Sequence, residues 1–99
     1  MKINTEALKI QPTDIVTRTV HDTGTQIVVR FPNGFGASII NHSFSYGTEI
    51  GVISFESLDI FDFELTYSTP VTNDVLGWQS TEDVIEVLNQ ISALNHIGE

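Results

Sequence analysis

The side chains best suited to nucleophilic chemistry lie in the segment 42–45, where His42 is followed by Ser43 and Ser45. A serine becomes a nucleophile when a neighbouring base takes its proton, and many hydrolases present that serine in a G-x-S-x-G turn. Neither serine has this glycine pattern around it. A catalytic triad is defined by geometry, which spacing along the chain does not supply. We therefore expect these residues to lie in a solvated loop without a catalytic role.

A second candidate is the triplet Asp22-Thr23-Gly24, which is the triplet that aspartic proteases use. The chain of 99 residues also has the size of a retroviral-type protease subunit. In that family the triplet follows the apolar end of a strand, whereas His21 precedes it here. The sequence also lacks a convincing second glycine motif or a glycine-rich flap. Because Asp and Gly are common turn residues, we interpret the triplet as a turn.

The sequence contains no typical metal-binding pattern. It has no cysteine, and its histidines do not have the spacing of zinc ligands. These histidines are His21, His42 and His96. Asp59, Asp62 and Glu64 do not follow the alternating carboxylate pattern of a calcium loop. The sequence therefore predicts no metal site, no cofactor and no enzymatic activity.

The charge distribution is the most unusual property of the sequence. Four basic residues stand against thirteen acidic ones, which gives a net charge of −9. The last basic residue is Arg30, and ten of the acidic residues follow it. Direct binding to nucleic acid needs a basic surface, and so does binding to an anionic membrane. We therefore exclude both, and we expect the partner to be a protein with a basic surface.

Two acidic segments and one aromatic loop are the candidate contact surfaces. In the segment 60–67 (IFDFELTY), apolar and polar residues alternate, so a strand would bury one side and expose the carboxylates on the other. The start of the C-terminal helix carries a second acidic group. These carboxylates form a solubilising coat or, alternatively, imitate the phosphate spacing of a duplex. The partner-binding candidates are Phe44, Tyr46, Asp62, Glu64, Glu82, Asp83 and Glu86.

The elements that would position these residues are short strands followed by one helix. Runs of β-branched and aromatic residues predict strands at 14–20, 26–31, 35–41, 50–56 and 60–67. Apolar residues at helical spacing predict a helix that extends to about Leu94. We therefore predict a single α+β domain over residues 1–99. Its fold would be an antiparallel meander of four to five strands with one C-terminal helix packed on one face, and a small closed barrel is the alternative.

Local signals mark the ends of several elements. Gly24 is free to adopt positive φ in the first turn, and Pro32-Asn33-Gly34 predicts a tight hairpin turn. Ser80 begins the helix with an acidic residue three positions later, which is a capping box. Thr5 is expected to cap a short N-terminal helical turn, although an edge strand is equally consistent with residues 1–12. Trp78 is expected to fill the junction between sheet and helix.

Parts of the chain resemble a group of small uncharacterised proteins encoded by bacteriophages. The similarity lies in NGFGASIINHSFSYG (33–47) and in LTYSTPVTNDVLGWQSTEDVIEVLNQISAL (65–94). Those proteins have a similar N-G-aromatic-G-A-S segment, an S-Y-G loop and a T-P-V/I-T-x-D-V-x-G segment before an acidic helix. Residues 1–25 do not share it. The resemblance implies a phage accessory protein, and the group has no activity to carry over.

Together, these observations lead to one expected function and one alternative. We expect a non-enzymatic phage accessory protein that binds a basic host protein, as an inhibitor or a nucleic-acid mimic. The alternative is an assembly component of the phage particle, which would oligomerise through exposed sheet edges. The sequence has no apolar run of membrane-spanning length, and MKINTEALKI lacks the apolar segment of a signal peptide. We therefore expect the protein in the cytoplasm of the host cell.

Overall fold

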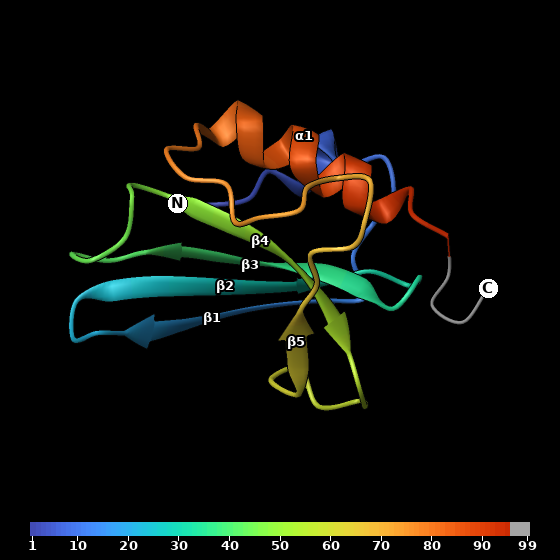
Figure 1. Cartoon of the computed structure of the whole chain (residues 1–99), viewed down its shortest axis with the longest axis horizontal. Coiled ribbons are helices and arrows are strands. Elements are labelled where there is room, and N and C mark those ends of the chain that lie inside the picture. Colours follow the sequence, from blue (N-terminus) through green and yellow to red (C-terminus); the bar gives the residue numbers. More distant parts are fainter. Residues whose placement is uncertain (96–99) are drawn as a thin grey trace.

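The computed structural model describes residues 1–95, which form a five-stranded antiparallel sheet and one helix (Figure 1). The strands lie in the order β1-β2-β3-β4-β5, so each strand pairs with its neighbour in the sequence. The elements are η1 (Thr5–Ala7), β1 (Asp14–Val20), β2 (Gly24–Arg30), β3 (Phe35–Asn41), β4 (Glu49–Phe55), β5 (Phe63–Leu65) and α1 (Thr81–Ser92). This arrangement confirms the predicted α+β meander. The sheet is open, with β1 and β5 at its edges, so the barrel alternative is wrong.

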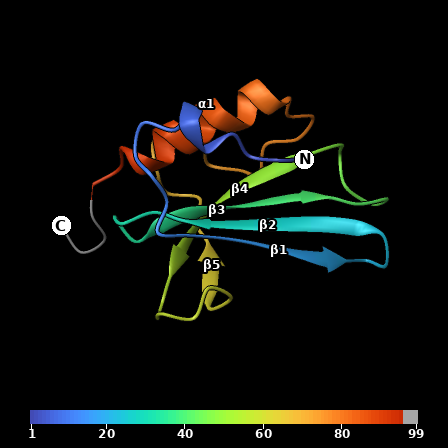
Figure 2. The same ribbon diagram turned by 180° about the vertical axis from the view of Figure 1, so that it is seen from behind.

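The helix α1 lies across one face of the sheet and forms the core with it (Figures 1 and 2). The predicted apolar stripe of α1 packs against the inward side chains of β2, β3 and β4. The largest side chains of this core are Phe31, Ile50, Leu88 and Ile91, and all are almost completely buried. Burial of each such side chain contributes about 1.5–3 kcal/mol to folding. The helix is therefore held mainly by its apolar face.

The capping box predicted at the start of α1 is confirmed. The Ser80 hydroxyl accepts a hydrogen bond from the Asp83 N–H (3.1 Å), and the Asp83 carboxylate accepts one from the Ser80 N–H (3.0 Å). These bonds lower the pKa of Asp83 below its usual value of 3.8, first through the backbone N–H and then through the hydroxyl of Ser80. Two amides that lack helical partners are thereby satisfied.

The hairpin turns differ in how they use glycine. Gly34 adopts φ +87° in the turn between β2 and β3, as predicted. In the turn between β1 and β2, His21 and Asp22 adopt positive φ, and Gly24 does not. Gly24 instead begins β2, where an added Cβ would lie 2.4 Å from the His42 Cβ. The glycine is required there by close packing, and the prediction of a left-handed Gly24 is wrong.

The predicted strand 60–67 is wrong in length, because only Phe63–Leu65 pair with β4. Residues 60–62 belong to the β4–β5 turn, in which the Asp62 N–H donates to the Asp59 carbonyl (3.0 Å). Beyond Leu65, another segment occupies the rest of the outer edge of β4. Leu76 and Ile50 exchange two backbone hydrogen bonds of 2.9 Å, which places the chain that leads to α1 beside the first half of β4. Phe61 and Tyr67 lie outside the strand, and both are exposed.

The predicted cap of the N-terminal helical turn is also wrong. Asn4 caps the N-terminal 3-10 turn through its side-chain oxygen, in place of Thr5.

The segment that leads from β5 to α1 contains local polar contacts. The Thr72 hydroxyl accepts from the Asp74 N–H (3.1 Å), and the Asp74 carboxylate accepts from the Val75 N–H (2.7 Å). These two side chains therefore satisfy two amides of the loop.

Candidate protein-interaction surface

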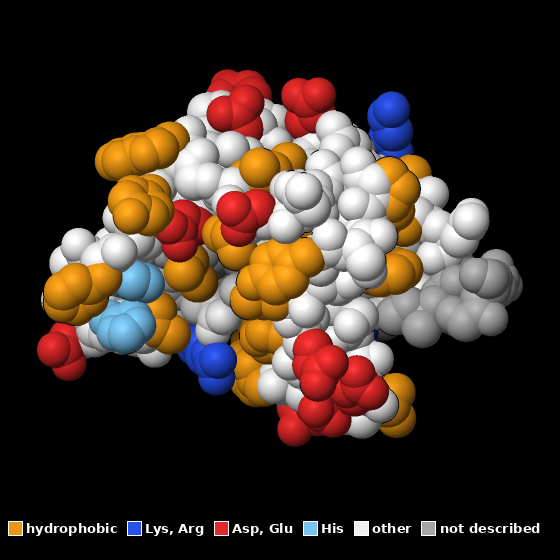
Figure 3. Space-filling view, viewed as in Figure 1, with side chains coloured by type: hydrophobic (Ala, Val, Ile, Leu, Met, Phe, Trp, Pro, Cys, Tyr) orange, Lys and Arg blue, Asp and Glu red, His pale blue; other side chains and the backbone are white. Residues whose placement is uncertain are grey.

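Exposed aromatic rings gather at the end of the sheet where the β1–β2 and β3–β4 turns meet (left in Figure 3). The side chains of Phe44, Tyr46 and Trp78 are 82%, 69% and 75% exposed. Two histidine rings lie beside Phe44, with centroids 6.1 and 6.2 Å from its own. We call this surface the aromatic end; it consists of His21, His42, Phe44, Tyr46 and Trp78. Isolated exposed apolar residues are ordinary, but a cluster of them is typical of contact surfaces.

Backbone pairing with the β3–β4 loop brings Trp78 to the aromatic end. The Trp78 N–H donates to the Tyr46 carbonyl (2.8 Å), and the Gln79 N–H donates to the Thr48 carbonyl (2.9 Å). The Tyr46 and Trp78 rings consequently lie with centroids 6.5 Å apart. The prediction that Trp78 fills the junction between sheet and helix is wrong, because its ring faces solvent.

The backbone conformation of Trp78 is unusual for a large side chain. Its φ is +54°, in the left-handed region that bulky residues rarely adopt. One side of the ring lies on Gly47, where an added Cβ would stand 2.6 Å from Trp78 Cε3. Positive φ at a bulky residue costs on the order of 1–3 kcal/mol and occurs most often at functional sites. The strained backbone of Trp78 thus carries a ring that is exposed to solvent.

The loop 42–47 holds its shape through its own polar groups. The Ser45 hydroxyl lies within hydrogen-bonding distance of the His42 carbonyl (2.8 Å) and the Gly47 carbonyl (2.7 Å). It also accepts from the His42 N–H (3.0 Å). The Nδ1 atom of His42 accepts from the Phe44 N–H (3.0 Å), so its ring supports the loop. These contacts give His42 and Ser45 a structural role in presenting Phe44 and Tyr46.

The predicted acidic candidates form two groups on opposite faces of the sheet. Figure 3 shows one red group over α1 and another over the turn between β4 and β5. The first contains Glu82, Asp83 and Glu86, and the second contains Asp62 and Glu64 with their neighbours Glu56 and Asp59. The five predicted carboxylates therefore do not form one row. The predicted Phe44 and Tyr46 lie on one loop, where Phe44 is beside the two histidines and Tyr46 is beside Trp78.

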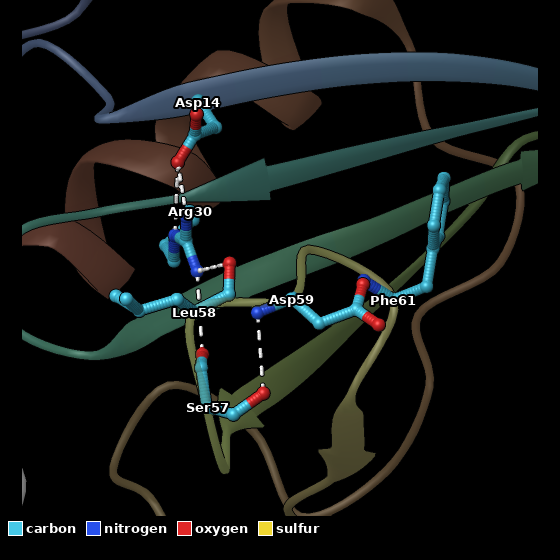
Figure 4. A network of polar contacts seen from close by, with 6 residues as sticks. All are labelled: Asp14, Arg30, Ser57, Leu58, Asp59 and Phe61. Carbon is cyan, nitrogen blue, oxygen red and sulfur yellow. Dashed lines mark hydrogen bonds and ion pairs between the residues drawn. The ribbon is translucent and has the colours of Figure 1, made fainter.

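Arg30 fixes the acidic β4–β5 turn to the face that α1 leaves free (Figure 4). Its neighbours in sequence, Val29 and Phe31, lie in the core beneath α1, so the Arg30 side chain points to the other face. Its guanidinium donates to the carbonyls of Ser57 (3.4 Å) and Leu58 (3.0 Å). It also forms the ion pair with Asp14 (Nε–Oδ2 3.0 Å). One cation thus joins β1, β2 and the turn.

Arg18 makes a second contact between the sheet and this turn. Its guanidinium carbon lies 4.3 Å from the centroid of the Phe61 ring, and its Nε donates to the Gln26 side chain (2.7 Å). A cation over an aromatic face contributes about 0.5–1 kcal/mol at an exposed site. Phe61, which was predicted on the apolar side of the strand 60–67, therefore contacts Arg18 on the face of the sheet opposite the core.

Residues 1–95 contain no group of three or more histidine, cysteine or acidic side chains placed to hold a metal ion. His96 lies outside the described residues. Within the same range, no helix has both the length and the apolarity that crossing a membrane requires.

Comparison of the chain with family models, with curated protein sequences and with solved structures finds no match. The sequence contained one signal for Trp78 that was missed. It follows Gly77 and lies outside any periodic apolar segment, which is typical of a residue that does not belong to the core.

Proposed function

We propose that this protein acts, without catalysis, by binding a partner protein through the aromatic end. The observation that carries the proposal is the exposed pair of Tyr46 and Trp78, with the exposed Phe44 on the same loop as Tyr46, on turns whose own hydrogen bonds fix them. Tyrosine and tryptophan dominate the binding energy of many protein interfaces. A surface that is already ordered loses little conformational entropy on binding, which favours affinity.

The charge of the chain supports a partner with a basic surface. Glu49 lies at the base of the aromatic end, where its carboxylate accepts from the Tyr46 N–H (3.0 Å). Asp22 lies in the adjacent β1–β2 turn, next to His21. The two acidic groups on the faces of the sheet add a long-range negative potential. Such a potential raises the association rate of a cationic partner and weakens as salt is added.

This arrangement favours contact by the aromatic end over imitation of a duplex along a single row of carboxylates. A duplex mimic needs its charges on one surface, and the carboxylates of α1 and of the β4–β5 turn lie on opposite faces. In the proposal, the acidic groups guide a basic protein and the rings make the contact. Origin from a phage stays a prediction that follows from the resemblance. A host factor as the target and inhibition of that factor stay predictions that rest on the acidity and small size of the chain together with that resemblance.

The proposal is tested by capture from a nuclease-treated bacterial lysate at low and moderate salt, with mass spectrometry of the bound proteins. Trp78→Ala and Tyr46→Ala are compared with Leu58→Ala, because Leu58 is 91% exposed but lies on the β4–β5 turn. We expect one basic protein in stoichiometric amount, which is lost with either aromatic variant, retained with Leu58→Ala and weakened by salt. Equal capture by all variants would contradict the proposal.

A further inference from the structure

The outer edge of the sheet at β1 has unpaired backbone groups. The sheet order places β1 at an edge, and its seven residues are mostly exposed. Figure 2 shows β1 beside β2, at the start of the strand order. An edge strand presents a row of free N–H and C=O groups that another strand can pair with.

The hydrogen-bonding order of the sheet decides which residues of β1 face outward. The Phe31 N–H donates to the Phe35 carbonyl, so the odd-numbered residues of β2 bond to β3. The even-numbered residues of β2 therefore bond to β1. Since Thr17 lies opposite Ile27, the odd-numbered residues of β1 direct their backbone groups away from the sheet. These outward residues are Ile15, Thr17 and Thr19.

The usual devices that protect an edge strand are missing from β1. Natural edges are commonly blocked by proline, lysine, a bulge or inward-pointing charges. The strand DIVTRTV contains neither proline nor lysine, and its register with β2 is continuous from Asp14 to Val20. Its two charged residues are both engaged within the molecule, Asp14 by Arg30 and Arg18 by Gln26 and Phe61.

The charge distribution makes β1 the edge at which two copies of the chain repel each other least. Residues 1–31 carry four cations and three carboxylates, a net charge of +1, whereas the remaining residues carry −10. An approach through α1 or the β4–β5 turn would bring two acidic groups together. An approach through β1 keeps the acidic groups of one copy away from those of the other copy.

We propose that a second copy of this chain pairs with β1 in antiparallel orientation and joins two sheets into one. A two-fold axis at Thr17 would place Ile15 opposite Thr19 and each Thr17 opposite its own copy. Cross-strand pairs of β-branched residues are favourable. The pairing uses the outer edge of β1, and the proposed function uses the aromatic end. The pairing therefore does not depend on the proposed function.

Sedimentation equilibrium of the purified chain over a wide range of concentrations tests this pairing. We expect the mass to rise with concentration from 11.0 kDa to twice that value. Thr17→Pro removes an outward N–H to which no strand pairs within residues 1–95, and proline is tolerated at such positions of edge strands. This variant should remain monomeric, and Thr17→Val, which keeps the N–H, should dimerise like the original chain.

A second variant keeps the proposal falsifiable if circular dichroism shows that Thr17→Pro does not fold. The double substitution Ile15→Lys and Thr19→Lys changes exposed side chains and places like charges opposite each other across the pair. It should weaken the dimer at low salt, with partial recovery at high salt. The proposal would be overturned if the original chain were monomeric at every concentration. It would also be overturned if both the Thr17→Pro variant and the double lysine variant dimerised like the original chain.

Discussion

Replacement of Asn33 should uncouple the helix from the β2–β3 turn. Asn33 is buried, and its Nδ2 donates to the carbonyls of Ile91 (2.9 Å) and Leu94 (3.1 Å) at the end of α1. Its Oδ1 accepts from the Phe35 N–H (3.0 Å). One side chain thus satisfies two carbonyls at a helix end and one amide of a hairpin, which are groups that would otherwise be orphaned.

The expected cost follows from these three bonds. Each net hydrogen bond contributes about 1 kcal/mol, so Asn33→Ala should lower the free energy of unfolding by about 3 kcal/mol. Asn33→Asp should cost more, because it removes both donors and places a negative charge at the negative end of the helix dipole. With an m-value of about 1.5 kcal/mol per molar urea, Asn33→Ala should lower the urea midpoint by about 2 M.

Urea unfolding followed by far-ultraviolet circular dichroism at neutral pH measures these changes. Asn73→Ala is the matched control, because Asn73 is exposed and such substitutions usually change stability by less than about 0.5 kcal/mol. The reasoning would be refuted if Asn33→Ala unfolded at the same urea concentration as Asn73→Ala. It would also be refuted if Asn33→Asp were no less stable than Asn33→Ala.

Three further changes test other parts of the structure by the same unfolding assay. The buried Oγ1 of Thr69 has no hydrogen-bond partner within residues 1–95, so Thr69→Val should leave stability unchanged or raise it by up to about 1 kcal/mol; a clear loss would reveal a missed partner. Gly47→Ala should cost about 1–2 kcal/mol, because φ is +60° and the new Cβ would press on the Trp78 ring; an unchanged midpoint would contradict this packing. The Asp83 carboxylate stabilises the fold when ionised, and its pKa is lowered, so its contribution is present above pH 3.8 and is lost as the pH falls below that value. The stability difference between the original chain and Asp83→Asn should therefore close below about pH 3.8, and a constant difference would refute the capping argument.

The sequence predicted those parts of the fold that depend on neighbouring residues. The β-branched residues of DIVTRTV predicted the bounds of β1, and Pro32-Asn33-Gly34 marked the β2–β3 turn. The capping box at Ser80 needed only a hydroxyl and a carboxylate three residues later. In each case the physical cause lies within a few residues of its effect, so a single sequence contains the whole signal.

The parts that the sequence did not predict depend on contacts between distant segments. The end of β5 is set by Leu76 on the outer edge of β4, and nothing in the alternation of residues 60–67 indicates that competitor. The position of Trp78 likewise depends on a backbone bond to Tyr46, far away in the sequence. Phe44 and Tyr46 are recognisable as contact candidates because they lie in a polar loop, whereas Trp78 was predicted to fill the junction between sheet and helix.

Amide hydrogen exchange of the protein with and without its captured partner shows whether the aromatic end makes the contact. We expect the partner to slow exchange in residues 42–49 and 76–79, which carry the rings and their supporting bonds. Exchange in the acidic turn 56–62 should stay as it is in the free protein. Protection confined to α1 and residues 56–64, with exchange at 42–49 unchanged, would contradict the account.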